Sequence, residues 1–215
     1  MKIGILGTGV VGTTIATRLV AVGYDVRMGS RSAGGEKATQ WVRQAGGRSS
    51  EGTFADAAAH GEIVFNCTSG AGSLDALRAA GSKNLTDKIL VDVANPLDFS
   101  HGMPPTLFVC NTDSLGEQIQ RAYPQTKVVK TLNTVTSAVM VNPSLIAAKQ
   151  TMFISGNDTA AKETVIGLLK RDFGWEKVFD LGDITGARSQ EMHLALWLRL
   201  FVTLQTPNVN IDVAR

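Results

Sequence analysis

A glycine-rich turn near the start of the chain constrains the fold more than any other sequence feature. The segment GTGVVG, at residues 7–12, follows a short apolar run at 2–6 and precedes apolar residues that recur at helical spacing. A strand, a glycine turn and a helix in this order are typical of the first crossover unit of a dinucleotide-binding sheet. Gly23 is expected to end the helix, and a second strand is predicted over 24–28.

Apolar runs and helical patterns alternate along the rest of the chain. Further strands are predicted at 62–67, 88–94, 127–133, 151–155 and 177–181. Helices are expected over 36–45, 53–60, 73–80, 114–123, around Leu168–Leu169, and from about 183 or 185 past Phe201. The Gly/Ser-rich segment AGGRSSEG, at 45–52, is interpreted as a loop. The alternation predicts an α/β fold, a doubly wound, mostly parallel sheet of the Rossmann type with a C-terminal strand–helix elaboration.

Composition and charge argue against several kinds of partner. The formal net charge is +2 and the basic residues form no dense run, so a nucleic-acid surface is not expected. Cys67 and Cys110 stand in no metal-binding spacing, so we expect reduced thiols in a cytoplasmic protein without a metal site. The most apolar late segment, HLALWLRLFVTL at 193–204, is too short to span a bilayer and contains Arg199. We therefore expect neither a membrane partner nor a signal peptide.

The spacing of the three glycines gives each of them a separate role beside a pyrophosphate. Gly7 allows the tight turn, Gly9 lets the backbone approach the phosphates, and Gly12 lets the helix pack closely on the strand. The free N–H groups at the start of the helix then face the anion. The predicted cradle comprises Gly7, Thr8, Gly9, Val10, Val11 and Gly12. The alternative is a glycine-rich turn that binds no ligand.

The end of the second strand favours one dinucleotide over the other. An NAD-binding chain usually places an acid there, where it holds the ribose hydroxyl. This chain has Ser30 and Arg31 instead, in the segment RMGSRS. A hydroxyl and a planar guanidinium suit a phosphate monoester, so NADP(H) is predicted over NAD(H). Lys37 would add positive charge at the start of the next helix, although such a residue is usually just solvated.

Polar residues follow three later strands of the predicted sheet. In open α/β sheets the ligand lies beyond the carboxyl ends of the strands, so these residues are expected to outline one cleft. Asn95-Pro96 is predicted to wall the nicotinamide. The predicted cleft residues are Thr68, Ser69, Asn95, Pro96, Asn133 and Thr134.

Four segments carry a resemblance to a known family. The most specific is KIGILGTGVVGTTIATRLVAVGYDVRMGSR at 2–31, and looser ones are ANPL at 94–97, KTLNTV at 130–135 and LGDITGARSQE at 181–191. In these segments the chain resembles the NADPH-dependent oxidoreductases of the deazaflavin coenzyme F-420, whose relatives include the cytosolic domain of the six-transmembrane metalloreductases. The resemblance implies that the strand ending in Gly-Ser-Arg holds the adenosine phosphate of NADP(H). It also implies coenzyme F-420 or a flavin as co-substrate. The loop at 96–109 does not align with a substrate site.

A second group of enzymes opens with a similar glycine turn. The β-hydroxyacid dehydrogenases use a catalytic lysine on a helix and carry a long all-helical second domain, for which this chain has too little helix left. Lys130 and Asn133 do form a K-x-x-N, but on a predicted strand. We interpret Lys130 as structural and the match as coincidence.

These features predict an enzyme that transfers hydride between the nicotinamide and a flavin- or deazaflavin-like acceptor. Direct transfer between stacked rings needs orientation and exclusion of water but no protein general acid, so no catalytic residue is assigned. His101, in the candidate acceptor loop, is the histidine best placed to touch a substrate. Two alternatives stay open, an NADP(H)-sensing protein without turnover and a dehydrogenase of small carbonyl compounds.

The expected organisation is an NADP-binding domain at 1–135 with a C-terminal α/β extension at 136–215 packed on it. The last helix is apolar on nearly all sides, which predicts a homodimer because such a helix needs burial on more than one flank. The alternative is complete burial of this helix within one chain. The predicted dimer face comprises Leu194, Trp197, Leu198, Phe201 and Val202.

Overall fold

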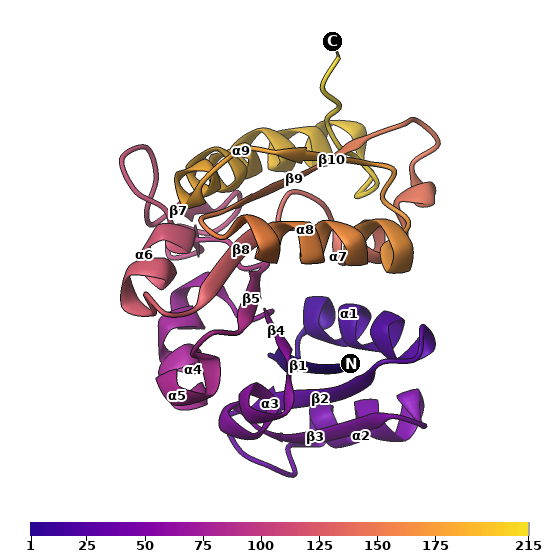
Figure 1. The fold of residues 1–215 in the computed structure, drawn as a ribbon. Helices are drawn as coiled ribbons and strands as arrows, with labels where there is room; N and C mark the ends of the chain where they lie inside the picture. The colour runs from indigo at the N-terminus through magenta and orange to yellow at the C-terminus, as the bar shows by residue number, and fades with distance from the viewer. Residues whose placement is uncertain (215) are drawn as a thin grey trace.

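The computed structural model describes residues 1–214 and contains one eight-stranded sheet with helices on both faces (Figure 1). The strand order is β10-β9-β8-β5-β4-β1-β2-β3. The strands of this sheet are β1 (Lys2–Leu6), β2 (Asp25–Ser30), β3 (Ser49–Thr53), β4 (Ile63–Asn66), β5 (Ile89–Asp92), β8 (Lys127–Thr131), β9 (Thr151–Gly156) and β10 (Lys177–Asp180). The pairings from β3 to β8 are parallel, and β9 pairs antiparallel with β8. The predicted α/β class and the mostly parallel sheet are confirmed.

Helices fill the connections between the strands. They are α1 (Val10–Ala21), α2 (Glu36–Ala45), α3 (Phe54–His60), α4 (Ser73–Ala80), α5 (Ser82–Leu85), α6 (Leu115–Ala122), α7 (Ser137–Val141), α8 (Thr159–Leu168) and α9 (Ala187–Leu204). The short strands β6 (Leu97–Asp98) and β7 (Thr106–Leu107) pair antiparallel apart from the main sheet. They lie within the loop that could not be aligned at the level of sequence.

The sheet separates two apolar cores, because alternate residues of its strands face opposite sides. Ile3 and Ile5 of β1 face one core, which α1, α2, α7 and α8 cover. Leu6 of β1 and Val64 of β4 face the other, which α3, α4 and α6 cover with the start of α9. The buried strands therefore present apolar residues on both faces, which explains their continuous apolar runs.

One strand differs from the expectation for its segment. Ser49–Thr53, interpreted as part of a loop, forms β3 and pairs parallel with β2 at the edge of the sheet. The segment begins Ser-Ser-Glu and shows no apolar alternation. Only Gly52 of this strand is buried. The strand is held by backbone pairing rather than by a hydrophobic face. Its last residue, Thr53, is the N-cap of α3, and its hydroxyl accepts a hydrogen bond from the N–H of Asp56.

Residues after β8 extend the sheet and then return across it. β9 and β10 add two strands beyond β8, and α9 lies over the same end of the molecule (Figure 1). After α9 the chain runs back along β9, where the side-chain amide of Asn210 donates to the backbone carbonyl of Thr151 at 3.1 Å. α9 itself is held at the carboxyl end of β8, where the Gln190 side-chain amide donates to the Lys130 carbonyl at 3.2 Å.

Candidate cofactor and acceptor site

The glycine turn between β1 and α1 shows which of its glycines the fold itself requires. Gly7 has φ of +118°, and a Cβ there would lie 2.6 Å from the Cys67 carbonyl oxygen. A Cβ on Gly12 would lie 2.3 Å from the Gly7 carbonyl oxygen. A Cβ on Gly9, by contrast, would meet no protein atom within 4 Å. Packing explains the first two glycines, and the third fits the close approach of a pyrophosphate.

The start of α1 is suited to an anion. Gly9 is the N-cap and has no side chain to bond the free N–H groups, and the first turn contains no acidic residue. The unpaired N–H groups and the positive end of the helix dipole therefore face the cleft. Val10, in this first turn, has 73% of its surface exposed.

A cavity of about 830 Å³ begins at this turn and runs along the ends of β1 and β2. Ser30, Arg31 and Lys37 lie at one end of it. The Ser30 hydroxyl donates to the Ser32 backbone carbonyl at 2.6 Å, which holds the loop after β2. Within residues 1–214, neither Arg31 nor Lys37 is paired with an acid, so both cations are available to a phosphate. Two acids, Glu36 and Asp75, also line the cavity. Neither belongs to the glycine turn.

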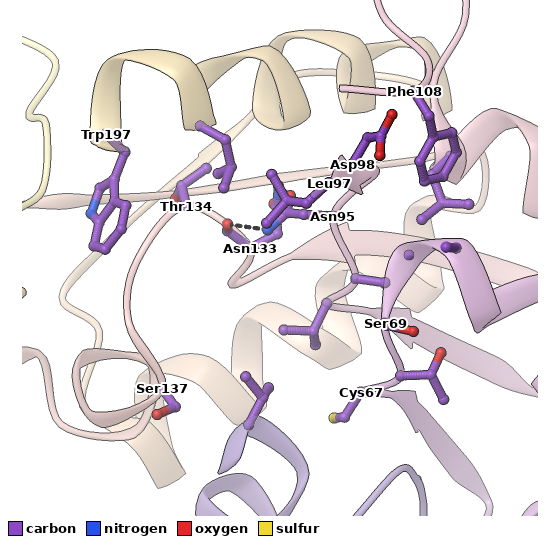
Figure 2. A pocket seen from close by; sticks show the side chains of 18 of the residues that line it. Cys67, Ser69, Asn95, Leu97, Asp98, Phe108, Asn133, Thr134, Ser137 and Trp197 are labelled. Carbon is purple, nitrogen blue, oxygen red and sulfur yellow. Dashed lines mark hydrogen bonds between the residues drawn. The ribbon is translucent and has the colours of Figure 1, made fainter. Parts of the chain in front are cut away.

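A second cavity, of about 850 Å³, adjoins the first and lies beyond the ends of β4, β5 and β8 (Figure 2). The two share Cys67, Thr68 and Ser69 as lining residues, so they form one continuous site across the carboxyl edge of the sheet. The second cavity also reaches α9, through Leu194 and Trp197. This is the place where an open α/β sheet binds a dinucleotide and its reaction partner.

Most residues predicted for the cofactor lie in these two cavities. The first is lined by Gly7, Thr8, Gly9, Ser30, Arg31, Lys37, Thr68 and Ser69. The second is lined by Val11, Thr68, Ser69, Asn95, Asn133 and Thr134. Gly12 is buried beneath the turn, and Pro96 is buried and absent from both linings. His101 is exposed and lines neither cavity.

Two asparagines join the strand ends at the floor of the second cavity. The Asn133 side-chain amide donates to Asn95 Oδ1 at 2.9 Å, the contact dashed in Figure 2, and also to the Gln190 carbonyl at 3.1 Å. The Asn95 side-chain amide in turn donates to the Asn133 carbonyl at 2.9 Å. Both N–H groups of the Asn133 amide and one N–H of the Asn95 amide are thus bonded to protein acceptors, so the pair fixes the shape of the floor and leaves one Asn95 N–H for a ligand.

The structure shows an unpartnered hydroxyl at one predicted cleft residue, Thr134, and adds lining residues that sequence reasoning did not assign to the site. Thr134 is 1% exposed, lines the second cavity, and its hydroxyl has no hydrogen-bond partner among the described residues. Asp98 ends β6, Phe108 directly follows β7, and Trp197 comes from α9. Trp197 stacks on Phe201 with ring centroids 5.7 Å apart and donates its indole N–H to the Val209 carbonyl at 3.0 Å. Only the tertiary fold brings these segments together, so no local pattern could have identified them.

A buried ion network supports the site from beneath. The Lys130 ammonium is fully buried and lies 2.8 Å from carboxylate oxygens of both Asp92 and Glu191. Burial alone would lower the pKa of Lys130, but the Asp92 and Glu191 carboxylates outweigh it and raise that pKa. Lys130 lies outside both cavity linings, which agrees with a structural role.

Glu191 connects this network to the helix before β8. Its carboxylate accepts hydrogen bonds from the backbone N–H groups of Leu115 and Gly116 at 2.8 and 3.0 Å, at the start of α6. Arg188, one turn earlier on α9, pairs with Glu117 of α6. These contacts hold α9 in the position from which Leu194 and Trp197 line the cavity.

Comparisons with known proteins agree with this geometry. A family model described as NADP oxidoreductase coenzyme F-420-dependent matches residues 2–96. A solved structure from an Arthrobacter species (strain FB24), described as a candidate F-420-dependent NADP reductase, is 52% identical with a TM-score of 0.95, and each chain covers 100% of the other. The chain belongs to the coenzyme F-420-dependent NADP oxidoreductase family. The predicted resemblance and the predicted enzyme class, an NADP-dependent oxidoreductase, are thereby confirmed.

Two further comparisons concern a more distant relative and a shared fold. Metalloreductase STEAP3 of Rattus norvegicus is 30% identical over 212 residues, which are 97% of this chain and 38% of the relative. The chain spans less than two fifths of the length of the curated relatives that it matches. A reductive aminase from Aspergillus terreus, solved in complex with NADPH and ethyl levulinate, has a TM-score of 0.66 at 20% identity. That structure covers 95% of this chain, which spans 62% of the aminase, and the likeness shows the shared fold.

Two further observations concern metals and membranes. Residues 1–214 contain no group of three or more His, Cys, Asp or Glu side chains arranged to hold a metal ion. In the same part of the chain, no helix has both the length and the hydropathy needed to cross a bilayer.

Proposed function

We propose that this protein transfers hydride between NADP(H) and a flat conjugated acceptor, such as a flavin or deazaflavin ring. The observation that carries the proposal is the continuity of two cavities of different character. The first has a glycine turn and the unpaired cations Arg31 and Lys37, as a phosphate-rich cofactor requires. The second is wide and mostly apolar, and it joins the first at Thr68 and Ser69.

The residues of the chain then have distinct roles in this proposal. When bound, the nicotinamide supplies the hydride chemistry. The turn at Gly9 receives the pyrophosphate, and Arg31 with Ser30 receives the adenosine phosphate. The apolar walls, including Val135 and Leu194, exclude water and hold two flat rings face to face. The unpartnered Thr134 hydroxyl is available to a polar atom of either ring system.

Two observations favour this proposal, one over each of the two alternatives. A sensor without turnover could keep the nicotinamide face covered by the loop after β5 or by α9, yet Asp98, Phe99 and Trp197 from these segments line an open cavity. A carbonyl dehydrogenase needs a proton donor for the developing alkoxide. Apart from the thiol of Cys67, whose pKa is raised by burial, the only titratable side chain of residues 1–214 in this lining is the carboxylate of Asp98.

The test is NADPH oxidation against a panel of acceptors. Deazaflavin, riboflavin, FMN, FAD, ferric chelates and quinones would be compared, with NADH as the alternative donor. We expect a ring acceptor to give the fastest turnover, with NADPH preferred to NADH. Binding of NADPH without oxidation by any acceptor would support the sensor instead.

A variant of His101 tests the absence of a protein general acid. Since His101 lines neither cavity, His101→Ala should change steady-state turnover by less than about tenfold, whereas loss of a positioned general acid typically costs 10²–10⁴-fold. The measurement is NADPH oxidation with the best acceptor of the panel. A thousandfold loss with unchanged NADPH affinity would point to a carbonyl substrate.

The proposal also covers how the chain is divided into two parts and where in the cell the protein acts. We place the cofactor-binding unit at 1–135 and assign residues 136–215 the role of closing the acceptor cavity, because Met140, Leu194 and Trp197 line it. We also propose a cytoplasmic location, which the free thiols of Cys67 and Cys110 support.

A further inference from the structure

A chain of hydrogen bonds connects the buried ion network to the loop after β4. The Asn66 side chain, at the end of β4, is completely buried. Its Nδ2 donates to Asp92 Oδ1 at 2.8 Å, and its Oδ1 accepts from the Thr68 hydroxyl at 2.7 Å. Thr68 is partly exposed and lines both cavities. The chain of hydrogen bonds therefore runs from the buried Asp92 to the boundary between the first cavity and the second.

The partners of Asn66 fix which way its amide faces. The Asp92 carboxylate accepts hydrogen bonds from the Lys130 ammonium at 2.8 Å and from the Ala94 N–H at 3.3 Å. As an acceptor, it requires the nitrogen end of the Asn66 amide. At the other end, the Thr68 backbone N–H lies 3.4 Å from Asn66 Oδ1 and, as a donor, requires the oxygen. Two independent neighbours thus impose the same orientation.

This orientation decides what the Thr68 hydroxyl can do. Asn66 Oδ1 carries no hydrogen, so the bond of 2.7 Å uses the hydrogen of the Thr68 hydroxyl. The Ser73 hydroxyl lies 3.0 Å from Thr68 Oγ1 and can then only be the donor in that contact. Ser73 engages one of the two lone pairs of Thr68 Oγ1, and the other is left for a ligand. Toward the cavities, Thr68 is therefore an acceptor and not a donor.

We infer that Thr68 accepts a hydrogen bond from a hydroxyl of the nicotinamide ribose, and that Asn66 and Asp92 are positioning residues that hold Thr68 in this state. The inference rests on the proposed function, which puts the pyrophosphate at Gly9 and the nicotinamide in the second cavity. The ribose joins these two parts of the cofactor. It therefore lies at the boundary of the two cavities, which Thr68 lines.

The chemistry of the cofactor supports a sugar hydroxyl at this point. Phosphate oxygens are acceptors, so they gain nothing from a hydroxyl whose hydrogen is already used within the protein. A ribose hydroxyl can donate. Because Asn66 fixes the Thr68 hydroxyl before the cofactor arrives, binding does not have to order it. Figure 2 shows Cys67 and Ser69, the chain neighbours of Thr68, at the edge of the second cavity.

Two fragments of the cofactor form a matched pair for the test. 2′-Phospho-ADP contains the adenosine phosphate and the pyrophosphate, and 2′-phospho-ADP-ribose adds only the ribose. Isothermal titration would give the Kd of each fragment and of NADP⁺, without any hydride acceptor. The quantity of interest is the ribose ratio, which we define as the affinity for 2′-phospho-ADP-ribose divided by the affinity for 2′-phospho-ADP.

Thr68→Val keeps the shape of the side chain and removes its hydroxyl. We expect the ribose ratio to fall by about three- to tenfold, the range of one net hydrogen bond, while the affinity for 2′-phospho-ADP stays the same. NADP⁺ should lose affinity by the same factor as 2′-phospho-ADP-ribose. Thr68→Ser, which returns the hydroxyl, should restore the ratio.

Variants of Asn66 test the positioning role, because Asn66 is fully buried and lines neither cavity. In Asn66→Ala the Thr68 hydroxyl loses its fixed acceptor and can rotate, so the ribose ratio should fall about threefold or more. A purely structural role would weaken both fragments alike and leave the ratio unchanged. Asn66→Ser, whose side chain is too short to join Asp92 to Thr68, is a second variant in case the first is unstable. Thr164→Val, at an exposed position on α8 outside both cavities, is the control and should keep the wild-type ratio.

The outcomes distinguish the inference from the proposed function. Equal weakening of both fragments in Thr68→Val would mean that Thr68 holds a phosphate, and a loss confined to NADP⁺ would mean that it holds the nicotinamide. Either result, or an unchanged ratio, would overturn the inference, and an unchanged ratio in the Asn66 variants would overturn the positioning role. The expected ratios without NADPH oxidation by any acceptor would support the inference and contradict the proposed function. Failure of NADP⁺ and both fragments to bind the wild-type protein would overturn both.

Discussion

At the residue scale, the three glycines of the turn meet two different requirements. Gly7 and Gly12 are needed for folding, and Gly9 is suited to a ligand. Gly7 and Gly12 have no room for a Cβ, whereas Gly9 has open space and an ordinary extended φ of −77°. The same three-glycine pattern thus contains two positions that fold the turn and one that fits a ligand. A substitution at each kind of position should therefore have a different effect.

We predict that Gly9→Val weakens NADPH binding by at least tenfold while the Tm of the protein without NADPH changes by only a few degrees. Its side chain would occupy the approach of the pyrophosphate without contacting the protein. Gly12→Ala is the matched variant and should lower the Tm, because its Cβ would lie 2.3 Å from the Gly7 carbonyl oxygen. Thermal melts with and without NADPH measure both. A large loss of Tm in Gly9→Val would contradict this assignment.

Arg31 should determine the choice between the two dinucleotides. Arg31→Ala removes a charge-assisted contact to phosphate, which should cost about 1.5–3 kcal/mol of NADPH binding and leave NADH binding nearly unchanged. Arg43→Ala removes an exposed positive charge from α2 away from the cavity and serves as the control. Isothermal titration of both cofactors checks the prediction. Equal affinities for NADPH and NADH in the wild-type protein would rule it out.

At the element scale, the ion network attaches α9 to the sheet and to α6. Lys130 of β8 lies between Asp92 of β5 and Glu191 of α9, and Glu191 also bonds the start of α6. These groups are almost completely buried, so each depends on the others for solvation. The network fixes where α9 lies and thereby where the acceptor cavity is closed.

We predict that Lys130→Met lowers the free energy of unfolding by about 3–5 kcal/mol, because two buried carboxylates lose their cation. Lys149→Met is the comparison, since the Lys149–Glu176 pair is exposed at 3.6 Å and should contribute less than about 1 kcal/mol. Urea unfolding measures both. If Lys130→Met kept full stability but lost turnover, a catalytic lysine would have to be considered instead.

At the scale of the whole molecule, α9 divides its apolar surface between the site and the solvent. Leu194 is buried and lines the cavity together with Trp197, so part of the predicted dimer face is used within the chain. Leu196 and Val202 are each 50% exposed and Leu204 is 56% exposed. The homodimer stays a prediction.

We expect Leu196→Glu combined with Val202→Glu to convert a dimer into a monomer, because charges at these two exposed positions cannot be buried in a contact without partners. Light scattering at micromolar concentration reads the mass of wild type and variant. Glu163→Gln, on the distant surface of α8, should keep the wild-type mass. A wild-type protein that is strictly monomeric would remove the prediction.

The sequence by itself determined the turn and the fold class. Gly7 is required by its own positive φ and Gly12 by the carbonyl of Gly7, five residues earlier, and apolar periodicity is set by which face of each element is buried. Such local determinants can be read from the order of residues alone. The edge strand β3 was not predicted, because backbone pairing rather than an apolar face holds it.

Only the tertiary structure determined which residues line the acceptor cavity. Asp98, Thr134 and Trp197 lie on three segments far apart in sequence and line one cavity only because α9 returns over the ends of β5 and β8. The antiparallel pairing of β9 with β8 and the buried ion pair of Glu191 with Lys130 hold α9 in this position. These are long-range contacts whose energy depends on which groups finally exclude water together, and no local residue pattern encodes that.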